Sequence, residues 1–114
     1  MPMIDQMTIA EVTKLLRQAA NPDKIILFGS YARNCADAGS DLDLLIVEPS
    51  VSDVAAETVR LLRVLSPLRV PADVVVVSQH DFANWSDTPG HILFEATKEG
   101  VVLYEAARTS DAVV

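Results

Sequence analysis

Three short runs of apolar residues constrain the fold of this chain most strongly. They occupy residues 24–28, 41–47 and 72–78, and turn-forming residues bound each of them. Each run is too short for a typical helix, and the third is rich in β-branched valine, so we expect three buried β-strands. Longer segments with helical periodicity separate them. This alternation predicts an α/β or α+β fold with a single mixed β-sheet and flanking helices.

Helical periodicity is clearest in residues 8–20 and 52–65. Thr8 and Glu11 have the spacing of a capping box, so we expect the first helix to begin at Thr8. The residues that we expect to be buried on the second helix are Val54, Leu61, Leu62 and Leu65. The shorter expected elements are a helix at 31–35 capped by Ser30, a helical turn at 80–85, a helix at 89–98 that Gly100 ends, and a strand at 101–104.

Size and charge narrow the functional classes. The chain has 114 residues, half of them hydrophobic, which predicts one domain with its core in residues 8–105 and a tail at 106–114. Nine basic and 16 acidic residues give a net charge of −7, which argues against a protein that coats nucleic acid. The mean hydropathy of +0.26 predicts either an unusually apolar core or apolar surface that a partner covers.

The cellular compartment is predicted from cysteine use and hydropathy. The one cysteine, Cys35, cannot form an intrachain disulfide, and we expect it to be a small packed residue rather than a nucleophile. No apolar run approaches the ~20 residues that span a bilayer, and no secretory signal is evident at the N-terminus. We therefore expect a cytoplasmic protein that does not bind membranes.

Two aspartates stand at the head of the second apolar run. Asp41 and Asp43 are two positions apart, so on a strand they face the same side while Leu42, Leu44 and Ile46 face the other. Two adjacent carboxylates repel each other unless a cation lies between them, and Mg²⁺ prefers such oxygen ligands. The alternative is a pair of solvated aspartates at a strand end.

A glycine and a serine follow the first apolar run directly. Gly29 allows the backbone to approach a ligand closely, and Ser30 adds a hydroxyl beside the free N–H groups of a turn or helix start. These groups suit a phosphate. The alternative is an ordinary strand-to-helix turn with Ser30 as its cap. Arg33 is either a phosphate ligand or a surface arginine.

Together, Gly29-Ser30, ten intervening residues and Asp41-x-Asp43 form the pattern G-S-x10-D-x-D. This pattern resembles the signature of the DNA polymerase beta-like nucleotidyltransferase superfamily. The longer match, GSYAR followed by SDLDLLIV, resembles its minimal nucleotidyltransferase (MNT) subfamily. Asn34 stands where these proteins most often have glycine. The resemblance implies the polymerase beta-like nucleotidyltransferase fold over residues 8–105.

The resemblance also implies roles for individual residues. Asp41 and Asp43 would bind metal, and Asp73, which begins the third apolar run, would supply a third carboxylate and act as the base. If the second and third strands pair, these carboxylates converge at one edge of the sheet and suit a two-metal Mg²⁺ site. Gly29, Ser30 and Arg33 would hold the triphosphate of ATP.

The resemblance implies a partner as well. Many minimal nucleotidyltransferases act as antitoxins that transfer AMP from ATP to a tyrosine of a helical HEPN-family RNase toxin, and we expect this activity here. One alternative is a non-catalytic module that neutralises its partner by contact. Another is a nucleotidyltransferase for a small molecule, such as an aminoglycoside, with a homodimer completing its pocket. The roles of His80, His91 and Trp85, the nucleotide preference and the stoichiometry stay open.

Overall fold

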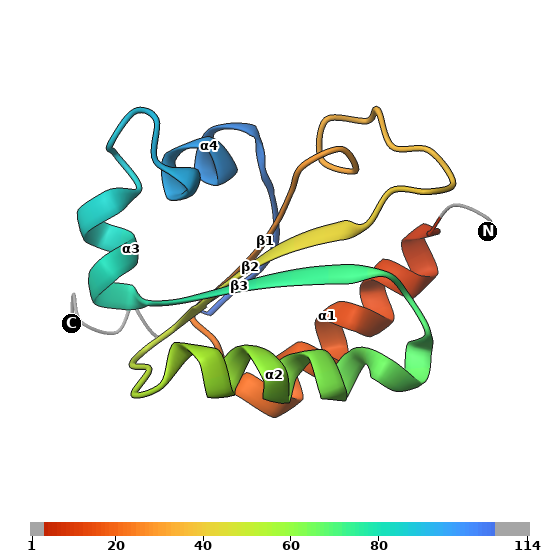
Figure 1. The fold of residues 1–114 in the computed structure, drawn as a ribbon, viewed down its shortest axis with the longest axis horizontal. Coiled ribbons are helices and arrows are strands. Elements are labelled where there is room, and N and C mark those ends of the chain that lie inside the picture. The colour runs from red at the N-terminus through yellow and green to blue at the C-terminus, as the bar shows by residue number, and fades with distance from the viewer. Residues whose placement is uncertain (1–3, 107–114) are drawn as a thin grey trace.

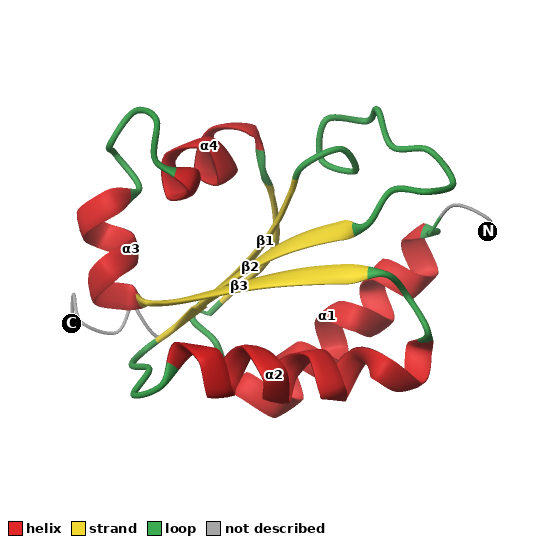
Figure 2. Ribbon diagram, viewed as in Figure 1, coloured by secondary structure: helices red, strands yellow, loops and turns green. Residues whose placement is uncertain are grey.

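The computed structural model describes residues 4–106 and shows a four-stranded sheet between two pairs of helices (Figures 1 and 2). The elements in chain order are α1 (Gln6–Ala20), β1 (Lys24–Phe28), β2 (Leu42–Glu48), α2 (Val54–Leu65), the 3-10 helix η1 (Ser66–Leu68), β3 (Ala72–Ser78), α3 (Gln79–Trp85), α4 (Ile92–Glu99) and β4 (Val101–Glu105). The strand order is β3-β2-β1-β4. β1 is antiparallel to β2 and β4, whereas β2 and β3 are parallel, so the prediction of one mixed sheet is confirmed.

Two hydrophobic clusters cover the two faces of the sheet. Helices α1 and α2 pack on the face that contains Leu42, Leu44 and Ile46. Helices α3 and α4 pack on the opposite face, which contains Leu45 and Val47 (Figure 1). Since both faces of β2 are buried, its sequence is almost continuously apolar. The prediction that Leu42, Leu44 and Ile46 share one face is therefore confirmed.

The starts of three helices differ from the prediction. The first helix begins at Gln6, because the carboxylate of Asp5 accepts a hydrogen bond of 2.8 Å from the amide of Thr8; Thr8 is therefore not the cap. Helix α2 begins at Val54 after the cap Asp53, two residues later than expected. Helix α4 begins at Ile92, because ring nitrogen Nδ1 of His91 accepts from the amide of Leu93.

Burial on α2 is narrower than its periodicity suggests. Leu61 and Leu65 are buried as predicted, but Val54 and Leu62 are 50% and 36% exposed. Only one stripe of the helix faces the sheet, and these two residues lie outside it. Among the described residues, the apolar side chains left exposed include Met7, Val59, Val101 and Val102. Part of the high hydropathy therefore reflects apolar surface.

The C-terminal part follows the prediction more closely. The segment at 80–85 is a full helix, α3, which the hydroxyl of Ser78 caps. Gly100 ends α4, and β4 follows at once. Ala106, expected in the tail, is buried and donates its amide to the carbonyl of Asp23; the rest of that tail lies outside the described residues. No helix among residues 4–106 has the length and hydropathy to cross a membrane.

Candidate nucleotidyl-transfer site

Strand pairing brings the predicted site residues to one edge of the sheet. Because β1 and β2 are antiparallel, the end of β1 lies beside the start of β2, and Phe28 pairs with Asp43. Because β2 and β3 are parallel, both strands start at this same edge, and Asp43 pairs with Asp73. Gly29 follows Phe28 directly, so residues from three strands meet here. The predicted pairing of the two aspartate-bearing strands is confirmed.

Gly29 and Asp43 are in close contact. The backbone of Gly29 has a φ of 75°, a left-handed conformation that favours glycine. A Cβ atom at this position would overlap Oδ2 of Asp43. A side chain at residue 29 would therefore displace the Asp43 carboxylate. This contact gives a physical reason for glycine at the first position of the motif.

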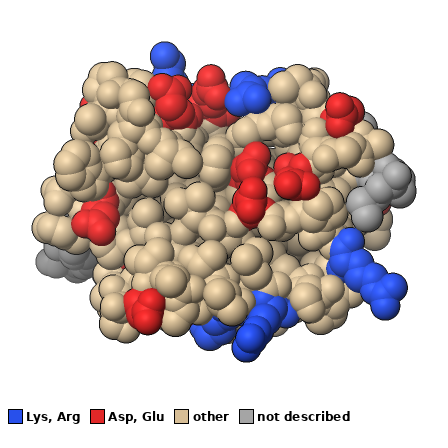
Figure 3. Space-filling view, viewed as in Figure 1, with Lys and Arg blue, Asp and Glu red and all other residues tan. Residues whose placement is uncertain are grey.

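Like charges crowd around Asp43. Burial raises the pKa of the Asp43 carboxyl above its usual range, the neighbouring carboxylates of Asp73 and Asp41 raise it further, and Arg33 opposes the shift. In the space-filling view, acidic side chains gather over the starts of β2 and β3 and again over α4 (Figure 3). An added cation would relieve this repulsion.

The carboxylates suit a hard divalent cation in chemistry, and two of them are neighbours in the sheet. Asp43 and Asp73 are register neighbours that can offer oxygen ligands to one ion. Asp41 lies one residue before β2, close enough to act on the charge of Asp43. Within residues 4–106, no three histidine, cysteine, aspartate or glutamate side chains are grouped as a metal site in their present positions. The three-carboxylate site therefore stays a prediction.

The turn after β1 differs from its prediction. Residues 31–35 do not form a helix; the amide of Arg33 donates to the carbonyl of Gly29, and that of Cys35 to the carbonyl of Ser30. Asn34 has a φ of 58°, which ends the turn before a helix can propagate. Cys35 is exposed rather than packed, so that prediction was wrong.

A cleft of about 380 Å³ lies between this turn and α4. One wall comes from the end of β1, the turn and β2, and the other comes from α4. The residues that line it are Phe28, Gly29, Ser30, Arg33, Asp43, Ile92, Glu95, Ala96 and Glu99. The cleft thus contains four of the six predicted site residues, while Asp41 and Asp73 lie outside its lining.

The α4 wall contains functional candidates that the sequence analysis missed. Nη1 of Arg33 lies 3.3 Å from Oε2 of Glu99, across 66 residues of sequence. Hydrogen bonds with Cys35 and Glu99 raise the pKa of the Arg33 guanidinium. Helical periodicity predicted α4 itself, but no local pattern indicates that its last turn faces residue 33. Arg33 is therefore in the cleft, as the phosphate-ligand interpretation requires, but it is already paired.

The two histidines have local structural contacts. The ring of His91 stacks on Trp85 with 5.3 Å between centroids, and Trp85 is 47% exposed. Ring nitrogen Nε2 of His80 lies 3.2 Å from the side-chain nitrogen Nδ2 of Asn84. Neither histidine lines the cleft.

A second acidic cluster lies at the opposite end of β2. Glu48 is buried, with one carboxylate oxygen lacking a hydrogen-bond partner. Burial raises its pKa to about 8, and a hydrogen bond with Glu57 adds to the shift. The guanidinium of Arg60 donates hydrogen bonds of 2.7 and 2.6 Å to the two carboxylate oxygens of Glu57. These bonds lower the pKa of Glu57 to about 2. At this end of β2, a carboxyl with a raised pKa therefore lies beside a carboxyl with a lowered one.

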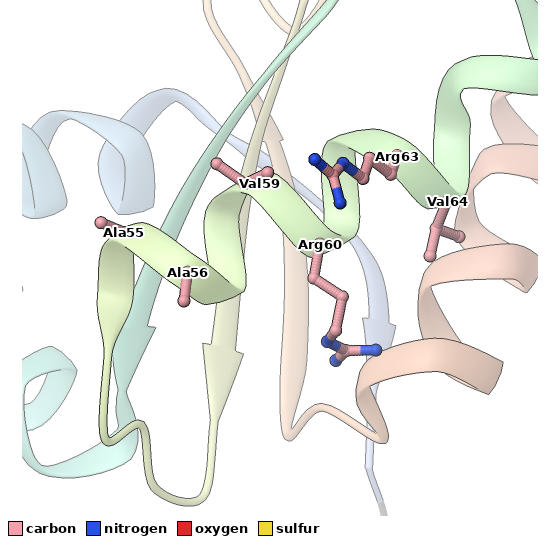
Figure 4. A pocket seen from close by; sticks show the side chains of 6 residues that line it. All are labelled: Ala55, Ala56, Val59, Arg60, Arg63 and Val64. Atoms are coloured by element: carbon pink, nitrogen blue, oxygen red, sulfur yellow. The ribbon is translucent and has the colours of Figure 1, made fainter.

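A larger hollow of about 720 Å³ follows the outer face of α2 (Figure 4). Only α2 lines it, with Ala55, Ala56, Val59 and Val64 and the two arginines Arg60 and Arg63. It contains no carboxylate, thiol or hydroxyl that could take part in phosphate chemistry. The smaller cleft beside Asp43 is therefore the better candidate site despite its size.

Solved structures of similar fold include a toxin–antitoxin complex with AMP-PNP, at 21% identity and a TM-score of 0.62 over 90% of this chain and 77% of the other. Another is a tri-AMPylated HEPN toxin in complex with MNT antitoxin from Shewanella oneidensis, at 20% identity and a TM-score of 0.57 over 96% and 79%. A putative nucleotidyltransferase from Sulfolobus solfataricus matches at 19% identity and a TM-score of 0.58 over 85% and 77%.

None of the curated proteins matches the sequence of this chain. Residues 10–109, in contrast, match the model of the family described as polymerase beta, nucleotidyltransferase. This match covers nearly the whole sequence, and it includes the glycine–serine turn and all three aspartates. The predicted fold family is thus confirmed, and the chain belongs to the polymerase beta nucleotidyltransferase family.

Proposed function

We propose that this chain is a Mg²⁺-dependent adenylyltransferase that acts as an antitoxin and transfers AMP from ATP to a tyrosine of a HEPN-family toxin. The observation that carries the proposal is the meeting of Gly29, Asp43 and Asp73 at the head of a cleft. Two solved structures of similar fold, a toxin–antitoxin complex with AMP-PNP and a complex with an AMPylated HEPN toxin, support the choice of nucleotide and partner.

Each residue has a defined task in this proposal. Asp41, Asp43 and Asp73 hold the metal, which would neutralise phosphate oxygens during transfer. Asp73 also accepts the proton from the attacking tyrosine hydroxyl. The Gly29–Ser30 turn holds the triphosphate in the cleft, and Arg33 contacts it when the phosphate displaces Glu99 from the guanidinium. The tyrosine oxygen forms a bond to the α-phosphorus, the bond to the β-phosphate bridging oxygen breaks, and pyrophosphate leaves.

The chain needs a protein surface for such a partner. Among the described residues, Val59 and Leu62 on α2 and Val101 and Val102 on β4 leave 36–52% of their area exposed. Exposed apolar side chains of this kind are consistent with a partner interface. They do not distinguish transfer from simple binding.

The test combines labelled ATP, Mg²⁺ and a helical HEPN-family toxin as the acceptor protein. Label on a tyrosine of that protein, lost in the Asp41→Asn/Asp43→Asn variant, is the expected result. Silencing of the toxin that persists unchanged in this variant would contradict transfer and favour neutralisation by contact. Label on an aminoglycoside instead would favour the small-molecule alternative.

A further inference from the structure

The cleft is acidic on both sides. Among the residues that line it, Asp43, Glu95 and Glu99 are acidic and Arg33 is the one basic residue. Arg33 is also paired, since its Nη1 lies 3.3 Å from Oε2 of Glu99. A ligand that entered would therefore meet a net negative charge and no unpaired cation among these lining groups.

The two glutamates are held on a fixed wall. They lie one helical turn apart on α4, whose Leu93 and Ala96 are buried against the sheet. A Cβ atom at Gly100 would overlap the carbonyl of Ala96 and the side chain of Ile26, so the end of α4 packs directly on β1. The helix cannot move away from the cleft without losing this packing.

This charge pattern discriminates between two forms of the same ligand. A free nucleoside triphosphate carries several negative charges and is repelled by Glu95 and Glu99, whereas bound metal removes part of that charge. We propose that Glu95 and Glu99 are specificity-determining residues that make the cleft select metal-bound over metal-free nucleotide. Glu99 acts by occupying Arg33, and Glu95 adds a second negative charge. This inference rests on the proposed function, because it needs a nucleotide in this cleft.

The ion pair suits this selective role better than a structural one. Its side chains are 50% and 42% exposed, and ion pairs this exposed contribute little to stability. Replacing Glu99 by glutamine therefore leaves the fold intact and releases Arg33 toward a phosphate. The side chain that is freed carries a planar set of donors suited to phosphate oxygens.

The experiment measures ATP binding without acceptor protein, once in EDTA and once in Mg²⁺. The Glu95→Gln/Glu99→Gln variant is expected to bind ATP in EDTA about tenfold more tightly than the unaltered chain, with a much smaller change in Mg²⁺. The Glu95→Asp/Glu99→Asp variant keeps both charges and should keep most of the selectivity. Glu11→Gln on α1 removes one exposed negative charge away from the cleft and should change neither affinity.

The outcomes separate this inference from the proposed function. If the unaltered chain binds ATP in Mg²⁺ but the double glutamine variant gains equally in both conditions or gains nothing, the selectivity inference is wrong and the proposed function stands. A gain as large in Glu11→Gln would also overturn it, because net charge would then explain the effect. If the unaltered chain binds ATP in neither condition, both are wrong.

Discussion

Strand β2 carries an acidic side chain near each end, and the protein accommodates them in opposite ways. At the end of the strand, Glu48 is 7% exposed and its pKa is raised by burial and by Glu57, which is in turn paired with Arg60. At the start, Asp43 lies beside Asp73 at the mouth of a cleft. The one basic group of that cleft is already paired with Glu99.

The difference shows at which end of β2 the protein's own side chains balance the acidic charge. At the buried end, the Arg60 guanidinium balances the charge of Glu57, and burial raises the pKa of Glu48 so that its neutral form is favoured. The pair at the start keeps unbalanced charge, although the pKa of Asp43 is raised by its neighbours. Unbalanced charge of this kind at a cleft is typical of functional sites. The same strand therefore has one end with a structural ion pair and one end where we propose that a cation binds.

The largest expected effect comes from Asp43→Asn. Removing this carboxylate should lower AMP transfer by about a thousandfold, because a metal ligand and its charge are lost. The melting temperature should stay the same or rise, because the repulsion from Asp73 and Asp41 is relieved. Transfer assays and thermal unfolding on the same preparation would measure both. A marked loss of stability would show that Asp43 has a structural role like that of Glu48.

The next effect comes from Gly29→Ala. An added methyl group would overlap the Asp43 carboxylate and strain a left-handed backbone, so we expect about a hundredfold loss of transfer and ~1–3 kcal/mol of stability. Gly90→Ala is the matched control, because Gly90 also has a positive φ but no atom within 4 Å of the added Cβ. Equal effects of the two variants would mean that backbone strain, and not the contact with Asp43, explains the loss.

A third prediction concerns pH and the buried end. Burial raises the pKa of Glu48 to about 8 in the folded state, so the unfolded chain releases this proton first as pH rises above the ordinary glutamate pKa of 4.5. Stability from this group is present below pH 4.5 and is lost as pH rises toward 8. Glu57, with a pKa of about 2, is ionised in the folded state throughout this window, and its stabilising contribution is lost only as pH falls below 4.5.

Glu48→Gln keeps the shape and a hydrogen-bond donor but cannot ionise. The free energy of unfolding of the unaltered chain should fall relative to this variant by about 1 kcal/mol per pH unit between pH 5 and 8. Chemical denaturation across that range would measure the difference. Glu11→Gln, at an exposed acidic position, is the control, and its free energy of unfolding should depend on pH as that of the unaltered chain does. If Glu48→Gln also shows the pH dependence of the unaltered chain, Glu48 is ionised in the folded state and the prediction is wrong.

The smallest effect is expected from Arg60→Lys. Lysine cannot form the bidentate contact with both oxygens of Glu57, so we expect the free energy of unfolding to fall by about 0.5 kcal/mol. Arg63→Lys on the same helix is the control, because Arg63 forms no ion pair within the described residues. If the two variants have equal free energies of unfolding, the bidentate contact between Arg60 and Glu57 contributes nothing measurable to stability.

Much of the fold followed from local patterns. The strands at 24–28 and 72–78 are correct to the residue, because turn residues delimit compact apolar runs. Helix starts were less accurate, because the cap depends on which nearby carboxylate or ring reaches the free amides, as Asp5 and His91 do. The helix expected at 31–35 failed at Asn34, whose left-handed backbone ends the turn.

The sequence by itself determined the fold family and the chemistry proposed for the site. Glycine, serine and two aspartates at this spacing indicated phosphate and metal binding through their resemblance to the nucleotidyltransferase signature, and the i and i+2 positions showed that the two aspartates share a face of the strand. Only the tertiary structure decided which groups oppose them. The parallel register puts Asp73 beside Asp43, and the packing of Gly100 on β1 brings Glu99 to Arg33. Such contacts between distant residues depend on how elements pack, which no local spacing encodes.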